Sequence, residues 1–330
     1  MDELPIRKRA YVLLVLTLIG LGVYWVGLRG AYYADDFKLV FSDPSSKIFY
    51  FFSHANPNSS FYRPIEWMIV ASIQSFAGMN TLPIHLLILL CHVVLSLLVY
   101  VAAFKLTKSQ TAASLSSGYM LLSQANAMAV LGNDMLSQVA GTLFGFISLW
   151  YFYRFYSTAR NEYRPTRSYF ISLLLFAVSL WFKETSVSFA LALTFLALIA
   201  DDQEWSRRVR KATYYLSPFY AVTIIYVLVH YLVVTRQAAD RYQFVFGTNM
   251  ITNLTMSVLS AFTPVSSVTT YVAYSQHHFI SLLVIIMVTF AVVAVVFFGL
   301  FKNGLTQPGK MLAAIAIANL FPMVLFKHMG

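Results

Sequence analysis

Long apolar runs without charged side chains follow one another along this chain. They extend over residues 10–28, 82–104, 111–132 and 212–235. Each comes close to the roughly 20 residues that a membrane-spanning helix needs. A membrane β-barrel would instead show alternating segments of about 10 residues. The pattern therefore predicts an all-α integral membrane protein, a polytopic helical bundle.

A longer apolar stretch, residues 168–200, is interrupted only by Lys183 and Glu184. As a single helix it would extend about 50 Å, which is too long for a hydrocarbon core of about 30 Å. Basic segments flank it, so both of its ends are expected on one side of the membrane. We therefore expect a hairpin of two short spans, with Lys183 and Glu184 at a tip that lies slightly below the opposite surface, within a cavity.

The composition agrees with a membrane protein. Hydrophobic residues make up 59% of the chain and charged residues only 11%, whereas a soluble domain has about 25% charged residues. The single cysteine, Cys91, lies inside an apolar run, which excludes a disulfide framework and a cysteine metal cluster. The first run is longer than the hydrophobic part of a signal peptide, and we expect it to be retained as a span.

The basic residues predict the orientation. Four groups of them flank the first, second, fourth and seventh predicted spans, and all four fall on one side if seven spans alternate. These residues are Arg7, Lys8, Arg9, Lys105, Lys108, Arg154, Arg160, Arg164, Arg167, Arg207, Arg208, Arg210 and Lys211. Basic residues prefer cytoplasmic loops, so we expect a cytoplasmic N-terminus. The net charge of +10 then reflects membrane orientation and indicates no nucleic-acid partner.

The first outer loop, residues 29–81, is long. It contains an aromatic cluster, residues 48–52, of a kind suited to the membrane interface. Further along the loop, Pro64 can open a helix and Gly78 can close it. A helix of about 14 residues is too short to span comfortably, so we expect it to lie along the outer surface.

The end of the chain leaves two topologies open. Residues 242–276 are uncharged, but Pro264 and several Ser and Thr residues make them a poor spanning helix. If residues 236–278 form a second outer loop, then residues 279–301 and 311–326 complete nine spans. If this stretch crosses, the last two spans reverse and the count becomes ten. The positive-inside rule favours the first arrangement, and we treat residues 1–330 as one transmembrane domain.

Charged residues of both signs gather on the expected outer side. They are Asp35, Asp36, Arg63, Glu66, Lys183, Glu184, Arg236, Asp240 and Arg241. Carboxylates can take a proton from an acceptor hydroxyl or bind a divalent metal. Lys and Arg can hold the phosphate of a lipid-linked donor. The mixture indicates a polar site at the membrane face.

Polar residues inside the apolar runs have plainer interpretations. We expect His85, His92 and His230 to be interhelical hydrogen-bond partners, because no second ligand has a spacing that matches a metal site. Asn133 and Asp134 could line a polar path, but packing contacts are favoured.

Three motifs give the sequence a resemblance to a known class of enzymes. They are "ADDF" at residues 34–37, "YRPIEW" at residues 62–67 and "FKET" at residues 182–185. In this order they resemble the GT-C glycosyltransferases, and within them the protein O-mannosyltransferases, including the transmembrane and TPR-containing type and bacterial relatives. Residues 132–154 are similar to the family's fourth span, and the resemblance extends to about residue 235. These enzymes move a sugar from a polyprenyl-phosphate carrier.

The resemblance implies roles for the acids. Asp35 would be the base that deprotonates the acceptor hydroxyl, and Asp36 would support it or bind the acceptor or a metal. Glu66 would support the site. Attack at the anomeric carbon would invert the stereochemistry. The leaving group is already a phosphate, so no cofactor is required, although a divalent metal at Asp35 and Asp36 stays open.

The resemblance also implies roles for the cations. Lys183 and Arg63 would hold the donor phosphate, and Arg236 or Arg241 would assist from the later loop. Glu184 would orient Lys183. The sugar would be mannose, and the acceptor would be a hydroxyl of a protein, a lipid or a glycan.

Alternatives to this interpretation exist at two levels. The acids could be hydrated loop carboxylates, Lys183 and Glu184 an ordinary hairpin tip, and Arg63 a headgroup anchor. The chain could also be a transporter or lipid flippase, or a non-catalytic assembly subunit. A transporter would carry charges near the bilayer midplane, whereas here they lie at outer span ends, which favours the enzyme.

The resemblance bears on location and completeness as well. The enzyme would lie in the cytoplasmic membrane of a bacterium or the endoplasmic reticulum of a eukaryote, with its site on the non-cytoplasmic side. Family members usually continue beyond the point at which this chain stops, at residues 326–330. It is therefore a short member or a truncated one.

Overall fold

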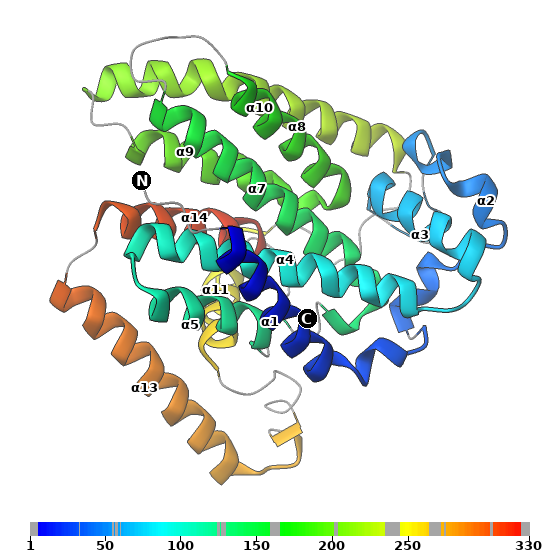
Figure 1. Cartoon of the computed structure of the whole chain (residues 1–330), viewed down its shortest axis with the longest axis horizontal. Helices are drawn as coiled ribbons and strands as arrows, with labels where there is room; N and C mark the ends of the chain where they lie inside the picture. The colour runs from blue at the N-terminus through cyan, green and yellow to red at the C-terminus, as the bar shows by residue number, and fades with distance from the viewer. Residues whose placement is uncertain are drawn as a thin grey trace. The chain divides into compact units, whose positions relative to one another are not determined.

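The computed structural model describes residues 6–32, 34–54, 56, 59, 61–123, 126, 130–158, 166–200, 204–234, 245–263, 272–273, 275–303 and 306–324. Every regular element within these residues is a helix (Figure 1). The chain forms two compact units, one of Met1–Ala190 with Tyr214–Gln237 and one of Leu191–Thr213 with Ala238–Gly330. The helical class predicted from the sequence is confirmed, while the single transmembrane domain stays a prediction.

Three helices of the described chain are long and apolar enough to cross a membrane, judged by length and composition. They are Leu82–Thr107, Asn133–Ser157 and Trp205–Val233. Shorter apolar helices accompany them at Ala10–Tyr24, Arg167–Phe182, Glu184–Ala200, Phe279–Ala294 and Gly309–Leu320. A helical membrane protein is therefore supported, and the count of nine or ten spans stays a prediction.

The first unit is built on a group of packed helices. These are α1 (Ile6–Tyr24), α4 (Leu82–Thr107), α5 (Gln110–Leu122), α7 (Leu136–Thr158) and α8 (Arg167–Phe182). The most extensive packing joins α7 to α8, and α4 packs against α1, α5 and α7. Figure 1 shows α4 and α5 side by side.

The third apolar run does not form one continuous helix. Helix α5 ends at Leu122, and Ser123 has an extended backbone with φ −58° and ψ 132°. The carbonyl of Leu121 accepts hydrogen bonds from the Tyr24 hydroxyl, at 2.7 Å, and from His92 Nε2, at 3.2 Å. Apolar surroundings offer no water for a carbonyl at a helix break, so neighbouring side chains must supply the donors. The interhelical role predicted for His92 is confirmed.

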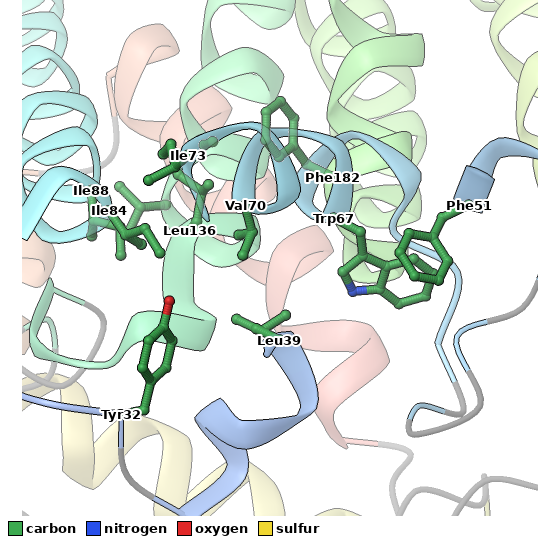
Figure 2. Packing of buried hydrophobic residues seen from close by; sticks show 12 residues of the cluster. Tyr32, Leu39, Phe51, Trp67, Val70, Ile73, Ile84, Ile88, Leu136 and Phe182 are labelled. Atoms are coloured by element: carbon green, nitrogen blue, oxygen red, sulfur yellow. The ribbon is translucent and has the colours of Figure 1, made fainter. Parts of the chain in front are cut away.

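The loop between α1 and α4 contains a helix of the predicted length. Helix α3 (Pro64–Ala77) begins with Pro64 and is closed by Gly78, whose φ of +59° favours glycine. One side of α3 is buried through Trp67, Val70 and Ile73. Figure 2 shows this side packed in a cluster that also contains Tyr32, Leu39, Phe51, Ile84, Ile88, Leu136 and Phe182. Helix α3 is therefore a packed part of the first unit.

The other elements of this loop are short. They are η1 (Gly27–Arg29), η2 (Ala34–Leu39), α2 (Pro44–Lys47) and η3 (Tyr50–Phe52). The aromatic cluster predicted for the membrane interface divides here. Phe51 is buried against Trp67, with ring centroids 5.1 Å apart, whereas Phe49 is exposed.

The break predicted at Lys183 and Glu184 is present, with a short helix on each side of it, while the hairpin itself stays a prediction. We call this break the hairpin tip. Helix α8 ends at Phe182, Lys183 is extended at φ −152° and ψ 132°, and η5 (Glu184–Val187) leads into α9 (Ser188–Ala200). Two glycines of α7 let this segment approach closely. A Cβ atom on Gly141 would lie 3.3 Å from Lys183 Cβ, and one on Gly145 would overlap the Phe189 ring. This small-residue spacing is typical of closely packed membrane helices.

The rest of the chain is helical where it is described. Helix α10 (Trp205–Val233) begins earlier than its uncharged run and contains Pro218. In the first unit, its aromatic residues Tyr215 and Phe219 pack against Tyr169 of α8. In the second unit, α11 (Asn249–Phe262) packs against α13 (Phe279–Asn303) and α14 (Gln307–Val324). The last two helices coincide with the two final predicted spans.

Candidate functional site

Asp36 is a buried carboxylate with two hydrogen-bond donors from a distant segment. Asn133 Nδ2 donates to one of its oxygens at 2.8 Å, and the Asp134 backbone N–H donates to the other at 3.2 Å. Both donors lie in η4 (Asn133–Met135), which leads directly into α7. Asp36 is only 6% exposed. These bonds attach the first loop to the start of α7, and they exclude a freely hydrated loop position for Asp36.

Arg63 and Glu184 form a bidentate ion pair. Arg63 Nε donates to one Glu184 oxygen at 2.9 Å, and Nη2 donates to the other at 2.8 Å. The two side chains are 13% and 25% exposed. Burial acts to lower the pKa of Arg63, but the attraction of Glu184 outweighs it and holds that pKa above its ordinary value. The pair joins the beginning of α3 to the break between α8 and α9.

Glu66 is fully enclosed next to this pair. Its carboxylate accepts a hydrogen bond of 2.9 Å from the Ser137 backbone N–H and lies 3.8 Å from Arg63 Nη1. Burial raises the pKa of Glu66 to about 7, although Arg63, Ser137 and Lys183 act to lower it. A carboxyl that changes protonation near neutral pH is thus held one turn from Arg63.

Lys183 lies at the helix break, directly before Glu184. Burial lowers the pKa of its ammonium group, and Arg63 lowers it further, while Glu184, Glu66 and Asp134 act in the opposite direction. Among the described residues, no hydrogen bond or ion pair engages this ammonium group. Lys183 therefore interacts electrostatically with three acids and with Arg63, but it forms no direct hydrogen bond or ion pair with a described residue.

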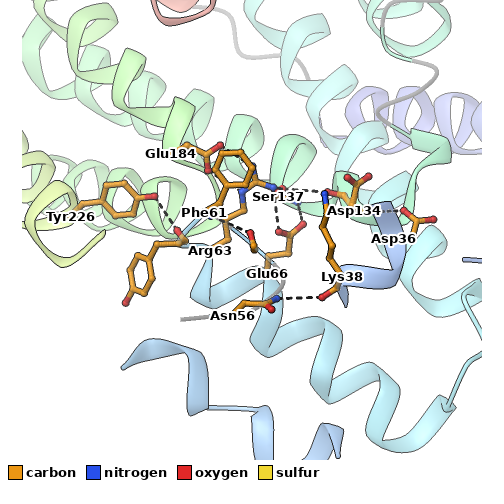
Figure 3. Close-up of polar contacts among 12 residues, drawn as sticks. Asp36, Lys38, Asn56, Phe61, Arg63, Glu66, Asp134, Ser137, Glu184 and Tyr226 are labelled. Atoms are coloured by element: carbon orange, nitrogen blue, oxygen red, sulfur yellow. Dashed lines mark hydrogen bonds and ion pairs between the residues drawn. The ribbon is translucent and has the colours of Figure 1, made fainter. Parts of the chain in front are cut away.

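The structure brings four of the predicted site residues together and links a fifth to them. Arg63, Glu66, Lys183 and Glu184 interact as one cluster in the first unit. Asp36 is connected to this cluster through η4, because Asp134 bonds to Asp36 by its backbone and interacts electrostatically with Lys183. Figure 3 shows Arg63, Glu66 and Glu184 close together, with Asp134 and Asp36 beside them.

Other predicted site residues are placed only in part or not at all. The backbone of Asp35 lies in η2, but its side chain is outside what the structure describes. Arg236, Asp240 and Arg241 lie outside the described residues altogether. Their predicted roles stay predictions.

Several polar residues at the site were not predicted from the sequence to belong to it, and packing contacts were favoured for Asn133 and Asp134. Asn133 and Asp134 hold Asp36, and Ser137 binds both Arg63 and Glu66. Lys38 points toward Asp134 in Figure 3. Their sequence positions could have indicated this, because Asn133, Asp134 and Ser137 are polar residues grouped at the start of an otherwise apolar predicted span.

The described part of the chain does not test the metal predicted at the acids of the first loop. No group of three or more His, Cys, Asp or Glu side chains there is placed to hold a metal ion. Because the Asp35 side chain is not described, a metal at Asp35 and Asp36 stays an untested prediction.

Comparison with known proteins assigns a family to more than half of the chain. The family described as dolichyl-phosphate-mannose-protein mannosyltransferase matches residues 64–233. This range includes Glu66, Lys183 and Glu184, and it begins directly after Arg63. No curated protein and no solved structure matches the chain.

Proposed function

Because the chain belongs to the dolichyl-phosphate-mannose-protein mannosyltransferase family, we propose that it transfers a sugar from a polyprenyl-phosphate carrier to an acceptor hydroxyl. The family match supports a membrane glycosyltransferase of the GT-C type. Mannose is the sugar that the family description suggests. The distribution of basic residues favours a site on the non-cytoplasmic side.

The proposed reaction is a single displacement. Asp35 removes the proton of the acceptor hydroxyl, and the resulting oxygen attacks the anomeric carbon of the sugar. The bond from that carbon to the phosphate oxygen breaks, and the polyprenyl phosphate leaves with the electron pair. The configuration inverts because the nucleophile enters opposite the leaving group.

Asp36 has a supporting role in this proposal. Its carboxylate accepts hydrogen bonds from the Asn133 side chain and the Asp134 backbone N–H, so we assign it to anchoring the first loop. Its bonds hold the chain next to Asp35, which directly precedes it. An anchored base is more effective than a mobile one, because small displacements of reacting groups are costly in rate.

Lys183 is the proposed cation for the donor phosphate. Its ammonium group is not committed to an ion pair among the described residues, and a cation beside the leaving phosphate stabilises the charge that develops on it. Arg236 and Arg241, predicted in the later loop, are further candidates.

Transfer can be tested with the full chain purified into liposomes that contain radiolabelled polyprenyl-phosphate mannose. We expect label to move to acceptor hydroxyls and polyprenyl phosphate to be released. Asp35→Asn is expected to lose transfer by about 100-fold or more, the scale of a missing general base. Asp43→Asn, which alters an exposed acid of the same loop, serves as the matched control. If the unmodified protein consumes no labelled donor, the proposed function is wrong.

A further inference from the structure

We propose that Arg63 is a positioning residue: through its ion pair with Glu184 it fixes the hairpin tip so that Lys183 can hold the donor phosphate. It does not bind that phosphate itself. This inference rests on the proposed function, and it separates two cations that the sequence analysis placed in one role.

The edge of the Arg63 guanidinium is occupied by protein groups. Nε and Nη2 both bond to Glu184, at 2.9 and 2.8 Å. Nη1 donates to Ser137 Oγ at 3.3 Å and lies 3.8 Å from Glu66. A phosphate that took bidentate contacts from Arg63 would have to displace a carboxylate that already has them.

The face of the guanidinium is covered as well. Arg63 Cζ lies 4.4 Å from the centre of the Phe61 ring, at cation–π distance. The preceding residue is held too, because the Tyr226 hydroxyl donates to the Tyr62 carbonyl at 3.0 Å. Figure 3 shows the Phe61 ring next to Arg63 and the Tyr226 hydroxyl directed at the backbone before it. Arg63 is thus fixed by its edge, its ring contact and its chain neighbour.

The Lys183 side chain depends on this arrangement through the backbone. Lys183 is the extended residue between α8 and η5, and Glu184 follows it immediately. The segment lies tightly on Gly141, because a Cβ there would come within 3.3 Å of Lys183 Cβ. Because the Lys183 Cβ lies close to Gly141 and the next residue is bound to Arg63, the backbone that carries the Lys183 side chain is held from both directions.

The charges around the hairpin tip also indicate that Lys183, and not Arg63, binds the donor phosphate. Glu184 neutralises Arg63, and Glu66 lies beside the pair. Freeing Arg63 for a phosphate would leave Glu184, which is only 25% exposed, without its partner and next to an incoming anion. Removing one partner of a buried ion pair is strongly unfavourable. Lys183 can meet a phosphate without this loss.

Two kinds of variant separate positioning from direct phosphate binding. Lysine binds phosphate well as a point charge but cannot form the planar, bidentate, ring-stacked contacts of arginine. Arg63→Lys therefore keeps a phosphate ligand but breaks the positioning. The exchanged pair, Arg63→Glu combined with Glu184→Arg, does the reverse: it keeps the ion pair and removes the cation from position 63. Arg63→Gln removes both.

The measurement is the KM for polyprenyl-phosphate mannose, varied as its mole fraction in proteoliposomes, together with kcat. We expect Arg63→Lys and Arg63→Gln to raise KM alike, by about tenfold, and the exchanged pair to return it to within about threefold of the unmodified protein. Arg207→Lys, the same change at an exposed position on α10, is expected to alter neither constant.

Two results overturn the inference. One is an Arg63→Lys protein with a KM within about twofold of the unmodified value. The other is an exchanged pair that elutes as a folded protein but has a KM no lower than that of Arg63→Gln. If the exchanged pair does not fold, Arg63→Lys decides alone.

Binding measured without transfer distinguishes this inference from the proposed function. Polyprenyl phosphate titrated into the same variants, followed by tryptophan fluorescence, should show the same order of affinities, with Lys183→Met weakest. Trp181 on α8 lies two residues before Lys183 and is suited to report it. If the unmodified protein transfers no sugar but the variants bind polyprenyl phosphate in this order of affinity, the proposed activity is wrong and the positioning role stands. If the unmodified protein transfers sugar normally and Arg63→Lys binds polyprenyl phosphate as tightly as it does, the positioning role is wrong and the activity stands.

Discussion

The Asp36 carboxylate accepts a 2.8 Å hydrogen bond from the side-chain amide of Asn133, across 97 positions of the chain. A second bond, 3.2 Å from the Asp134 backbone N–H, satisfies its other oxygen. The two bonds make an acid of the first loop part of the structure at the start of α7. Because Asp35 directly precedes Asp36, the placement of the proposed base depends on this anchor.

Replacing Asp36 by asparagine should destabilise the protein. The new amide nitrogen would face one of the two donors, Asn133 Nδ2 or the Asp134 N–H, and leave it without an acceptor. Hydrogen bonds to charged groups contribute about 1.5–3 kcal/mol, and we expect Asp36→Asn to lose stability on this scale. The check is the midpoint of thermal unfolding in detergent micelles, with Asp43→Asn, an exposed acid, as the control. Equal midpoints for the two variants would show that the anchor contributes nothing.

The stability of the fold should depend on pH through Glu66. Its pKa in the folded protein is raised to about 7 from an ordinary value of 4.5, chiefly by burial. Between these two values the folded protein holds a proton that the unfolded chain releases. The stabilisation is therefore fully present below pH 4.5 and is lost as the pH rises through about 7. The shift corresponds to a loss on the order of 3 kcal/mol.

Glu66→Gln tests this assignment because glutamine keeps the shape of the side chain but does not titrate. We expect its unfolding midpoint to stay nearly level between about pH 5 and pH 8, where that of the unmodified protein falls. Glu204→Gln, the same change at an exposed acid, should keep the original slope. A slope that survives in Glu66→Gln would assign the pH dependence to another group.

The fold was predictable where physical length limits the chain. A single helix over residues 168–200 would be too long for a bilayer, and the structure breaks it at Lys183, between the residues that bound α8 and η5. Likewise, Pro64 and Gly78 set the ends of α3 as expected. The break after Leu122 was not predicted, because the uncharged run of residues 111–132 has a suitable length for one continuous spanning helix. Its signal is local, in the polar residues Ser123 and Asn126.

The site was predictable as a set of residues but not as a set of pairs. Charge and spacing placed Arg63, Lys183 and Glu184 on one side of the membrane, yet Glu184 was expected to orient Lys183, and it binds Arg63. Which cation a carboxylate takes depends on distances across 121 positions, and no local pattern encodes them. For the same reason the sequence favoured packing contacts for Asn133 and did not indicate its bond to Asp36, which lies in another loop.

The close approach of the segment around Lys183 and Phe189 to α7 gives a packing prediction. A Cβ on Gly145 would overlap the Phe189 ring, whereas one on Gly118 of α5 would meet nothing within 4 Å. We expect Gly145→Ala to destabilise the protein by about 1–3 kcal/mol, as overpacking does. Gly118→Ala should be neutral or stabilising by up to about 1 kcal/mol, because alanine is the better helix former. Unfolding midpoints that move together for the two variants would contradict the tight contact.

The orientation of the first unit can be tested at two exposed positions that flank three predicted crossings. Met79 follows α3 and is 57% exposed, and Thr166 is the exposed residue before α8. In a Cys91→Ala background, we expect Met79→Cys to react with a membrane-impermeant maleimide from the non-cytoplasmic side. Thr166→Cys should react only after the vesicles are opened.

This pair of positions also tests the broken third run. Between them lie α4, the segment that is interrupted after Leu122, and α7. Three crossings put the two cysteines on opposite sides, whereas a segment that enters the bilayer and returns leaves only two crossings and puts them on the same side. Labelling of both from outside would therefore show that the residues after Leu122 turn back. It would also reverse the side of every later helix, and the Lys183 tip would then face the cytoplasm, where the proposed site could not meet a donor presented from the other side.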